Sequence, residues 1–318
     1  MIPTLLLGVA MAAHLEVYAR GLDDAGALLA LDDGTVLVSR PALNDVLSLR
    51  DVDGDGRVDA MRTALSFIDH AHGLAIHDDT LYVAGVKELV SAQRQPDGSF
   101  AETRVLVEDL PDGGPHPERA LAIGPDDKLY VAIAGTCASC TESNPEHGTL
   151  LQFDRDGANR RIFARGLRDR TAFAWHPKTH ELWGAERAKL LRIGEGFDDR
   201  AGSATAALSL PRRLVPSAFA FEKNGDAFAA IGARVVRIHF AEGKPASIED
   251  YATIEGRIGG LALARDGALL VSDAEHGIVY RVTRNHPPMT SSASEINAQP
   301  ILAKAFAVRG LRHPQSVI

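Results

Sequence analysis

Short runs of alternating apolar and polar residues recur along the chain. Each run contains an apolar strand, a polar β-turn and a second strand, and the six copies read GALLALDDGTVLVS, HGLAIHDDTLYVAG, RALAIGPDDKLYVAIA, TAFAWHPKTHELWGAE, SAFAFEKNGDAFAAIG and GGLALARDGALLVSDA. A period of two places alternate side chains on one face of a strand, as for Leu28 and Ala30 or Leu121 and Ile123. No segment shows a helical apolar period beyond about two turns. The pattern therefore predicts an all-β chain.

The copies are also regularly spaced. Turn residues at equivalent places follow one another at intervals of 42 to 52 residues, and they are Asp33, Asp79, Asp127, Thr179, Asn224 and Asp266. Several short strands in each copy, with a period in the forties, are the signature of a propeller blade. A solenoid is the alternative, but the strict alternation and the lack of helices argue against the common helical arrays. Six copies predict a six-bladed β-propeller over residues 14–284.

The two ends of the chain do not fit the repeat. Residues 1–13 are apolar and contain the A-x-A pattern Ala10-Met11-Ala12, which resembles a secretory signal without its basic n-region. A buried first strand or a disordered leader is the alternative for Leu5 to Val9. Residues 285–300 are polar and proline-bearing, as in a linker. The final AFAVRGLRHPQSVI restates the earlier VYARGLDD, so residues 285–318 either close the ring through a strand or begin another, truncated unit.

Composition and charge narrow the function classes. The 318 residues are 45% hydrophobic and 24% charged, which is typical of a globular chain and excludes disorder. The net charge is −8 and the Lys and Arg residues are scattered, which argues against a nucleic-acid partner. No apolar run reaches the ~18–20 residues of a membrane span. We expect no nucleic acid and no membrane span.

The two cysteines, Cys137 and Cys140 in GTCASC, allow several interpretations. A c-type haem site requires His after the second cysteine, where Thr141 stands. A zinc site requires two further ligands, and His147 alone does not supply them. A thioredoxin-like pair opens a helix, whereas loop sequence follows here. A small disulfide in an exported protein is favoured, with reduced, inert thiols as the alternative.

The segment DVDGDGRVDA reads as a calcium loop. Its carboxylates Asp51, Asp53, Asp55 and Asp59 occupy positions 1, 3, 5 and 9, and glycine occupies position 6. Position 12 is Arg62 in place of the bidentate glutamate, so the loop is not a complete EF-hand. An acidic turn between two strands is the alternative. A bound calcium ion here would be structural and remote from any chemistry.

Several phrases together resemble the soluble quinoprotein glucose/sorbosone dehydrogenase family. They run in the family's order over roughly residues 15 to 284, and they are DVDGDGRVDA, HAHGLAI, DLPDGGPHPERALAIGPDDKLYVAIA, FARGLRDRTAFAWHPKTHELW and GRIGGLALARDGALLVSD. The resemblance implies a six-bladed propeller that binds pyrroloquinoline quinone (PQQ) with calcium. It also implies oxidation of a sugar or aldehyde in the periplasm or outside the cell, with an external electron acceptor.

The resemblance assigns roles to five residues. His116 matches the family's base histidine, and an imidazole titrates near neutral pH as a proton acceptor should. His72 aligns with a polar residue that contacts cofactor or sugar. Arg168 and Asp169 match the arginine and asparagine that hold the quinone, and Arg257 matches the first of two arginines for its carboxylates. The guanidinium fork suits such carboxylates.

The chain also departs from the family. The long proline-rich loop whose carbonyls bind the catalytic calcium is absent from ELWGAERAKLLRIGEGFDD, Asp169 replaces asparagine, and Gly259 replaces the second arginine. Three functions therefore remain open. The first is a divergent PQQ-dependent dehydrogenase, and the second is a non-catalytic propeller that binds a ligand. The third is a metal-dependent lactonase-type propeller using Glu186, Asn224 and Asp273.

Overall fold

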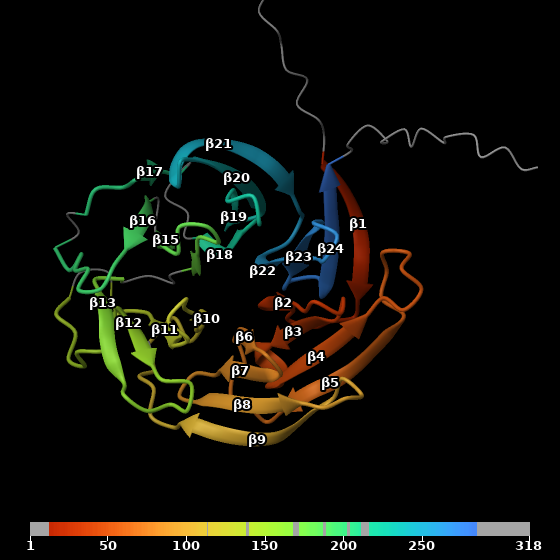
Figure 1. The fold of residues 1–318 in the computed structure, drawn as a ribbon, viewed down its shortest axis with the longest axis horizontal. Helices are drawn as coiled ribbons and strands as arrows, with labels where there is room; N and C mark the ends of the chain where they lie inside the picture. Colours follow the sequence, from red (N-terminus) through yellow and green to blue (C-terminus); the bar gives the residue numbers. More distant parts are fainter. Residues whose placement is uncertain are drawn as a thin grey trace, which may run out of the picture. The chain divides into compact units, whose positions relative to one another are not determined.

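The described part of the chain folds into six four-stranded antiparallel sheets arranged in a ring, which is a six-bladed β-propeller (Figure 1). The computed structural model describes residues 13–112, 114–137, 140–167, 172–186, 189–201, 204–210 and 216–284. Within these ranges, no helix has the length and apolar character that crossing a membrane requires. The predicted fold class is confirmed. The predicted leader, apart from Ala13, and residues 285–318 lie outside the described ranges.

Each of the first three blades is a run of four consecutive strands, with the innermost strand first. Blade 1 contains β2 (Leu28–Ala30), β3 (Val36–Arg40), β4 (Asp45–Arg50) and β5 (Ala60–Ser66), with the 3-10 turn η1 (Pro41–Leu43) between β3 and β4. Blade 2 contains β6 (Gly73–His77), β7 (Thr80–Ala84), β8 (Leu89–Arg94) and β9 (Phe100–Val107). Blade 3 contains β10 (Leu121–Ile123), β11 (Leu129–Ile133), β12 (Thr149–Phe153) and β13 (Arg161–Arg165).

Blades 4 and 5 repeat this order, and blade 6 departs from it. Blade 4 contains β14 (Ala172–Trp175), β15 (Leu182–Glu186), β16 (Lys189–Ile193) and β17 (Leu208–Ser209). Blade 5 contains β18 (Pro216–Phe221), β19 (Ala227–Ile231), β20 (Arg234–Ala241) and β21 (Lys244–Thr253). Blade 6 contains β22 (Ile258–Leu263), β23 (Leu269–Asp273) and β24 (Ile278–Arg284), and its outer strand is β1 (Ala13–Arg20) from the start of the described chain.

The ring is thus closed by pairing the first strand with the last. The antiparallel register runs from Ala13 opposite Arg284 to Arg20 opposite Ile278, with an irregularity between Val17 and Ala19. In Figure 1 the red β1 lies beside the blue β24. The fourth strand of blade 6 is therefore β1, which includes the start of the phrase VYARGLDD.

The core consists of six apolar layers, each between two neighbouring blades. One layer joins blade 2 to blade 3 and contains Leu89, Val107, Leu129 and Phe153, all buried. The second strand of most blades is buried on both faces, as in β11, because a blade packs against a neighbour on either side. Each blade therefore depends on both neighbours for the burial of its apolar side chains.

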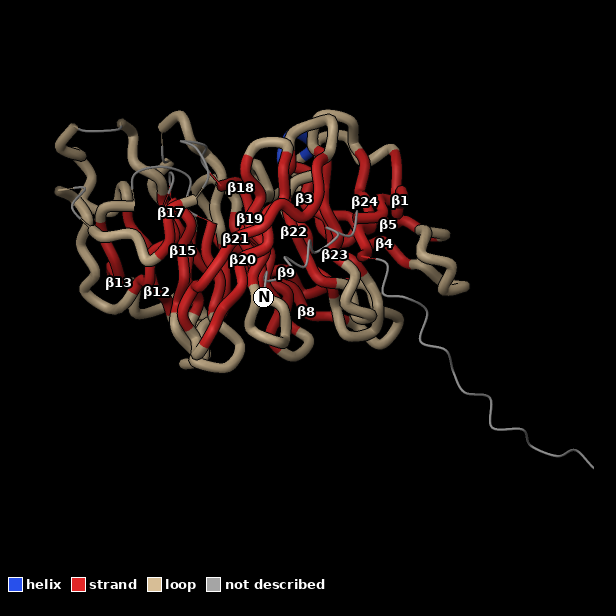
Figure 2. The backbone as a smooth tube through the Cα atoms, turned by 90° about the horizontal axis from the view of Figure 1, so that it is seen from above, coloured by secondary structure: helices blue, strands red, loops and turns tan. Residues whose placement is uncertain are grey.

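The propeller has two different ends. Successive antiparallel strands run in opposite directions, so alternate connections lie at opposite ends of a blade. One end holds the connections between blades and the connections between second and third strands, including η1 (Figure 2). We call this end the loop face. We call turn face the end that holds the connections between first and second strands and between third and fourth strands. Two long connections lie at the loop face: residues 108–120 join blade 2 to blade 3, and residues 134–148 join β11 to β12 within blade 3.

Candidate functional site

Three of the residues predicted to form the site lie on loops at one face of the ring. His72 immediately precedes β6, His116 lies between β9 and β10, and Arg257 immediately precedes β22. Each of these loops joins the outer strand of one blade to the inner strand of the next, so all three lie at the loop face. Arg168 and Asp169 lie outside the described residues, and their roles stay predictions.

His72 joins blade 2 to blade 3. Its Nδ1 lies 3.1 Å from the backbone carbonyl oxygen of Arg119, in the loop that carries His116. Because a carbonyl oxygen can only accept a hydrogen bond, Nδ1 carries the proton of this contact. The adjacent Gly73 permits the close approach, since a Cβ there would lie 2.4 Å from the same carbonyl oxygen. The glycine after His72 therefore brings one predicted site residue against the loop of another.

Arg119 is the buried centre of the His116 loop and was not predicted from the sequence. Its side chain has no solvent exposure. Its guanidinium donates hydrogen bonds to the carbonyl oxygens of Pro111 (2.6 Å), His116 (3.0 Å) and Glu118 (3.1 Å). Burial lowers the pKa of Arg119 to about 10, although the negative charges of Glu118 and Asp112 act to raise it. Leu121 and Ile123 alternate with a period of two, and extending this pattern backwards places Arg119 on the same side of the chain. This alternation was the signal from which its burial could have been predicted.

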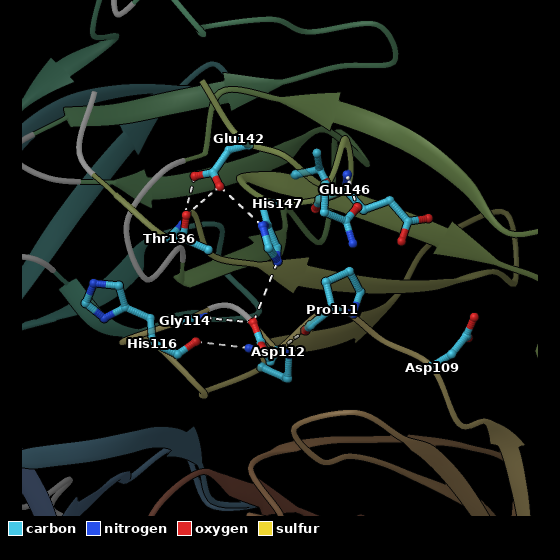
Figure 3. A network of polar contacts seen from close by, with 12 residues as sticks. Asp109, Pro111, Asp112, Gly114, His116, Thr136, Glu142, Glu146 and His147 are labelled. Carbon is cyan, nitrogen blue, oxygen red and sulfur yellow. Dashed lines mark hydrogen bonds and ion pairs between the residues drawn. The ribbon is translucent and has the colours of Figure 1, made fainter. Parts of the chain in front are cut away.

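A second loop, residues 134–148, supports the His116 loop. The His147 ring lies between two carboxylates, with Nδ1 3.2 Å from Glu142 Oε2 and Nε2 3.8 Å from Asp112 Oδ1 (Figure 3). Glu142 also accepts hydrogen bonds from the Thr136 backbone N–H (2.8 Å) and hydroxyl (2.6 Å). Burial raises the pKa of Glu142, but the Thr136 hydrogen bonds and the His147 ring outweigh it, so the pKa is lowered overall. The two long connections at the loop face are therefore joined to each other through His147.

The predicted disulfide lies in this second loop. Cys137 and Cys140 are bonded, with their Cα atoms 5.8 Å apart, and Cys137 directly follows Thr136. Among the described residues no cysteine is free. The disulfide interpretation is confirmed, and it places a covalent constraint beside the Thr136–Glu142 contact.

Arg257 forms an ion pair between blade 6 and blade 1. Its Nη2 lies 3.2 Å from Asp24 Oδ1, and 56% of its side chain is exposed. The other oxygen of Asp24 accepts the backbone N–H of Ala42 at 2.9 Å. Arg257 therefore offers a partly exposed guanidinium at the loop face, with Nη2 paired to Asp24 in the connection that leads to blade 1.

The residues considered for a lactonase-type metal site do not come together. Asn224 lies in the turn between β18 and β19, at the turn face, whereas Glu186 ends β15 and Asp273 ends β23, at the loop face. The fully buried Asp273 accepts hydrogen bonds from the backbone N–H groups of Glu275 and His276 and lies 2.8 Å from His276 Nδ1. Its hydrogen bond and charge raise the pKa of His276. Asp273 thus caps its own turn, and Asn224 lies at the opposite face from Glu186 and Asp273.

Two hairpins at the loop face are short. β15 ends at Glu186 and β16 begins at Lys189, so two residues separate the strands. Gly232 and Ala233 alone separate β19 from β20. The long calcium-binding loop that the family resemblance implies therefore has no counterpart between β15 and β16.

The predicted calcium loop connects β4 to β5 and lies at the turn face, away from His72 and His116. Ligand oxygens of Asp51, Asp53 and Asp59 lie within 4.8 Å of one another. The Asp51 carboxylate accepts the N–H groups of Gly54 (2.7 Å) and Gly56 (2.9 Å), and Asp59 accepts that of Val52 (2.6 Å). Asp55 instead accepts the N–H of Arg57. The loop places three of the four predicted carboxylates around one point.

Calcium binding by this loop can be tested with Asp51→Asn. We expect calcium to quench the luminescence of bound terbium in the wild type, and the variant to bind at least about tenfold more weakly, as for disturbed metal sites in general. Asp97→Asn is the matched control, because Asp97 lies in the corresponding connection of blade 2 and its carboxylate accepts hydrogen bonds from Ser99. Equal affinities in all three proteins would show that the loop is only an acidic turn.

The similarity of this chain to known proteins lies in its structure. No family model and no curated protein matches the sequence. The structure is similar to the holo PQQ domain of pyranose dehydrogenase from Coprinopsis cinerea (TM-score 0.73, 14% identity), covering 87% of this chain and 97% of that one. It is also similar to the PQQ-bound aldose sugar dehydrogenase of Streptomyces coelicolor (TM-score 0.66, 17% identity), covering 86% and 99%. The apo aldose sugar dehydrogenase of Escherichia coli matches with a TM-score of 0.69 and 14% identity, covering 86% and 100%. The chain therefore has the six-bladed propeller fold of these dehydrogenases.

Proposed function

We propose that the chain is a PQQ-dependent oxidoreductase that oxidises a sugar or a related aldehyde. The observation that carries this proposal is the common position of His72, His116 and Arg257 at the loop face of a propeller whose structural neighbours bind PQQ. Their loops come from three different places in the sequence and all lie at the loop face, where we propose that His116 acts as the base, His72 as a second imidazole and Arg257 as a cation. The supporting resemblance of sequence phrases runs through the same loops.

The residues present fit the cofactor's carboxylates better than its metal. Arg257 offers an exposed guanidinium that suits a carboxylate of PQQ. Arg168 is proposed as its partner on the basis of the sequence. The short hairpin between β15 and β16 supplies no long loop of carbonyls for a calcium ion beside the quinone. We therefore assign calcium to the loop of Asp51 at the turn face, where it would stabilise the fold.

The chemistry divides between cofactor and protein. When bound, the quinone supplies the two-electron oxidant that takes the hydride from the carbon bearing the substrate hydroxyl. His116 accepts the hydroxyl proton as that carbon becomes a carbonyl. The His72 ring, oriented by the Arg119 carbonyl, contacts cofactor or substrate. Arg257 holds negative charge at the mouth of the site. Each turnover would require an external electron acceptor, and we propose that the protein works in the periplasm or outside the cell.

A non-catalytic binding propeller is the second candidate. The short hairpin between β15 and β16 favours it, because the loop that the resemblance implies around the metal is absent there. In that case the same face would bind a ligand without turning it over.

Titration of the purified protein with PQQ and calcium separates the two candidates. We expect saturable, stoichiometric binding, and about tenfold or greater weakening in Arg257→Ala, because a hydrogen bond to a charged group contributes roughly 1.5–3 kcal/mol. Arg192→Ala is the matched control, since Arg192 also forms one exposed ion pair, with Glu181, but in blade 4 near the turn face. No binding at micromolar PQQ would favour the binding module over the dehydrogenase.

A further inference from the structure

We propose that Arg119 is a positioning residue that holds both histidines of the site, fixing the backbone of His116 with its side chain and the ring of His72 with its carbonyl group. This inference rests on the proposed function for its kinetic consequences. Its structural basis is independent of any cofactor, because every contact involved lies within the chain.

The guanidinium contacts the His116 loop on both sides of the histidine. It bonds the carbonyl of Pro111 before His116, that of Glu118 after it, and that of His116 itself. In Figure 3 the His116 carbonyl oxygen accepts one of these hydrogen bonds, while its ring points away from the Asp112–His147 contact. The fork of a guanidinium can engage several carbonyl oxygens at fixed angles, which a single ammonium group cannot do. The side chain therefore sets the path of the loop at the histidine.

The second connection leaves from the backbone of the same residue. The Arg119 carbonyl accepts the Nδ1–H of His72, which belongs to another blade. Gly73 and the backbone at Arg119 are so close that a Cβ at Gly73 would collide with this carbonyl and with Leu121. A displacement of Arg119 is thus transmitted to both imidazole rings.

Burying the Arg119 guanidinium costs free energy of folding. A fully buried guanidinium is expensive to desolvate. Its partners here are neutral carbonyls, and its Nε has no hydrogen-bond partner. An apolar side chain beside Leu121 could pack there without that cost, but it could not bond three carbonyls. The arrangement is explained if the conformation of the loop, rather than the stability of the core, requires the arginine.

The test measures two quantities in the same variants, the turnover rate and the ring signals of the histidines. We expect Arg119→Gln to lower kcat about 10²-fold, the size of effect that a displacement near 1 Å produces, with KM changed less than about threefold. Because Arg119 acts mainly through His116, the same substitution in a His116→Ala background should cause a much smaller further loss, namely the part transmitted through His72. Arg119→Lys, which keeps the charge, should recover part of the rate. Arg160→Gln is the matched control, because Arg160 contacts the same loop only at Asp109.

A second readout does not depend on activity. In protein with isotope-labelled histidine, with peaks assigned through His72→Asn and His116→Asn, we expect the ring signals of both residues to shift in Arg119→Gln and to stay in place in Arg160→Gln. Equal kcat losses with and without His116, or unmoved ring signals, would overturn the inference. If the wild type shows no PQQ-dependent turnover, the proposed function fails and the ring signals alone decide on Arg119. If Arg119→Gln does not fold, Arg119→Lys provides both measurements, with smaller shifts and about a tenfold loss of kcat expected.

Discussion

Replacing His116 by alanine is expected to lower PQQ-dependent dye reduction with an aldose by about 10²- to 10⁴-fold, the usual contribution of a positioned general base. The imidazole is half-buried in the loop between β9 and β10, whose path is fixed on both sides by Arg119. The alanine variant keeps the His116 carbonyl that Arg119 bonds, so the loop is retained while the proton acceptor is lost. The measurement is steady-state reduction of an artificial acceptor by reconstituted protein, over a range of pH.

His180→Asn provides the control for this experiment. His180 is an exposed histidine in the turn between β14 and β15, at the turn face. Its φ of 57° lies in the left-handed region, which asparagine adopts readily. We expect this variant to keep full activity. Should His116→Ala retain more than about a tenth of the wild-type kcat while binding PQQ normally, the base would have to be another group, and His72 would be examined next.

Replacing Phe153 by alanine is expected to lower the free energy of unfolding by about 3–5 kcal/mol, as for other fully buried phenylalanines. The Phe153 ring has no solvent exposure and lies in the apolar layer between blade 2 and blade 3, with Arg160 5.8 Å from its centroid. The cavity would open near the turn face, where Phe153 ends β12 opposite Leu129. Urea denaturation followed by tryptophan fluorescence would measure the loss.

Phe67→Ala makes the same chemical change at the surface. The Phe67 side chain is 96% exposed, so its removal uncovers no cavity, and we expect a change within about 0.5 kcal/mol. A similar loss in both variants would mean that unfolding does not report on the layer between blades. Loss of stability in Phe153→Ala alone would confirm that neighbouring blades stabilise each other.

The regular spacing of the turns was sufficient to predict the blades. Each anchor residue lies in the turn between the first and second strands of one blade, as Asp33 does between β2 and β3 and Asp266 between β22 and β23. This part of the fold is local, because each hairpin is encoded by its own alternation and turn residues. The disulfide could also be predicted from the sequence, since Cys137 and Cys140 are the two cysteines of the chain and have no competing partners.

The strand that closes the ring could not be predicted in the same way. The phrase VYARGL of β1 and the phrase AFAVRGL after residue 300 carry similar alternation, so the local pattern does not distinguish them. The choice depends on pairing with β24, at the other end of the propeller sequence. Arg119 was missed for another reason. An arginine in a loop is ordinarily solvent-exposed, but this one is buried with its guanidinium bonded to three carbonyl oxygens of its own loop.

The pairing of β1 with β24 has a consequence for how the protein is made. Blades 1 to 5 each receive their four strands in uninterrupted succession, so each can assemble while the ribosome is still elongating the chain. Blade 6 must wait, because β1 is translated first and its only partner is translated last among the described strands. During that interval the nascent chain exposes the apolar side of β1 and the open edges of two blades, which are surfaces that periplasmic or cytosolic chaperones recognise. Closure of the ring is therefore a late and non-local event in biogenesis, and it is the step at which premature release or a slow final segment would divert the protein toward aggregation.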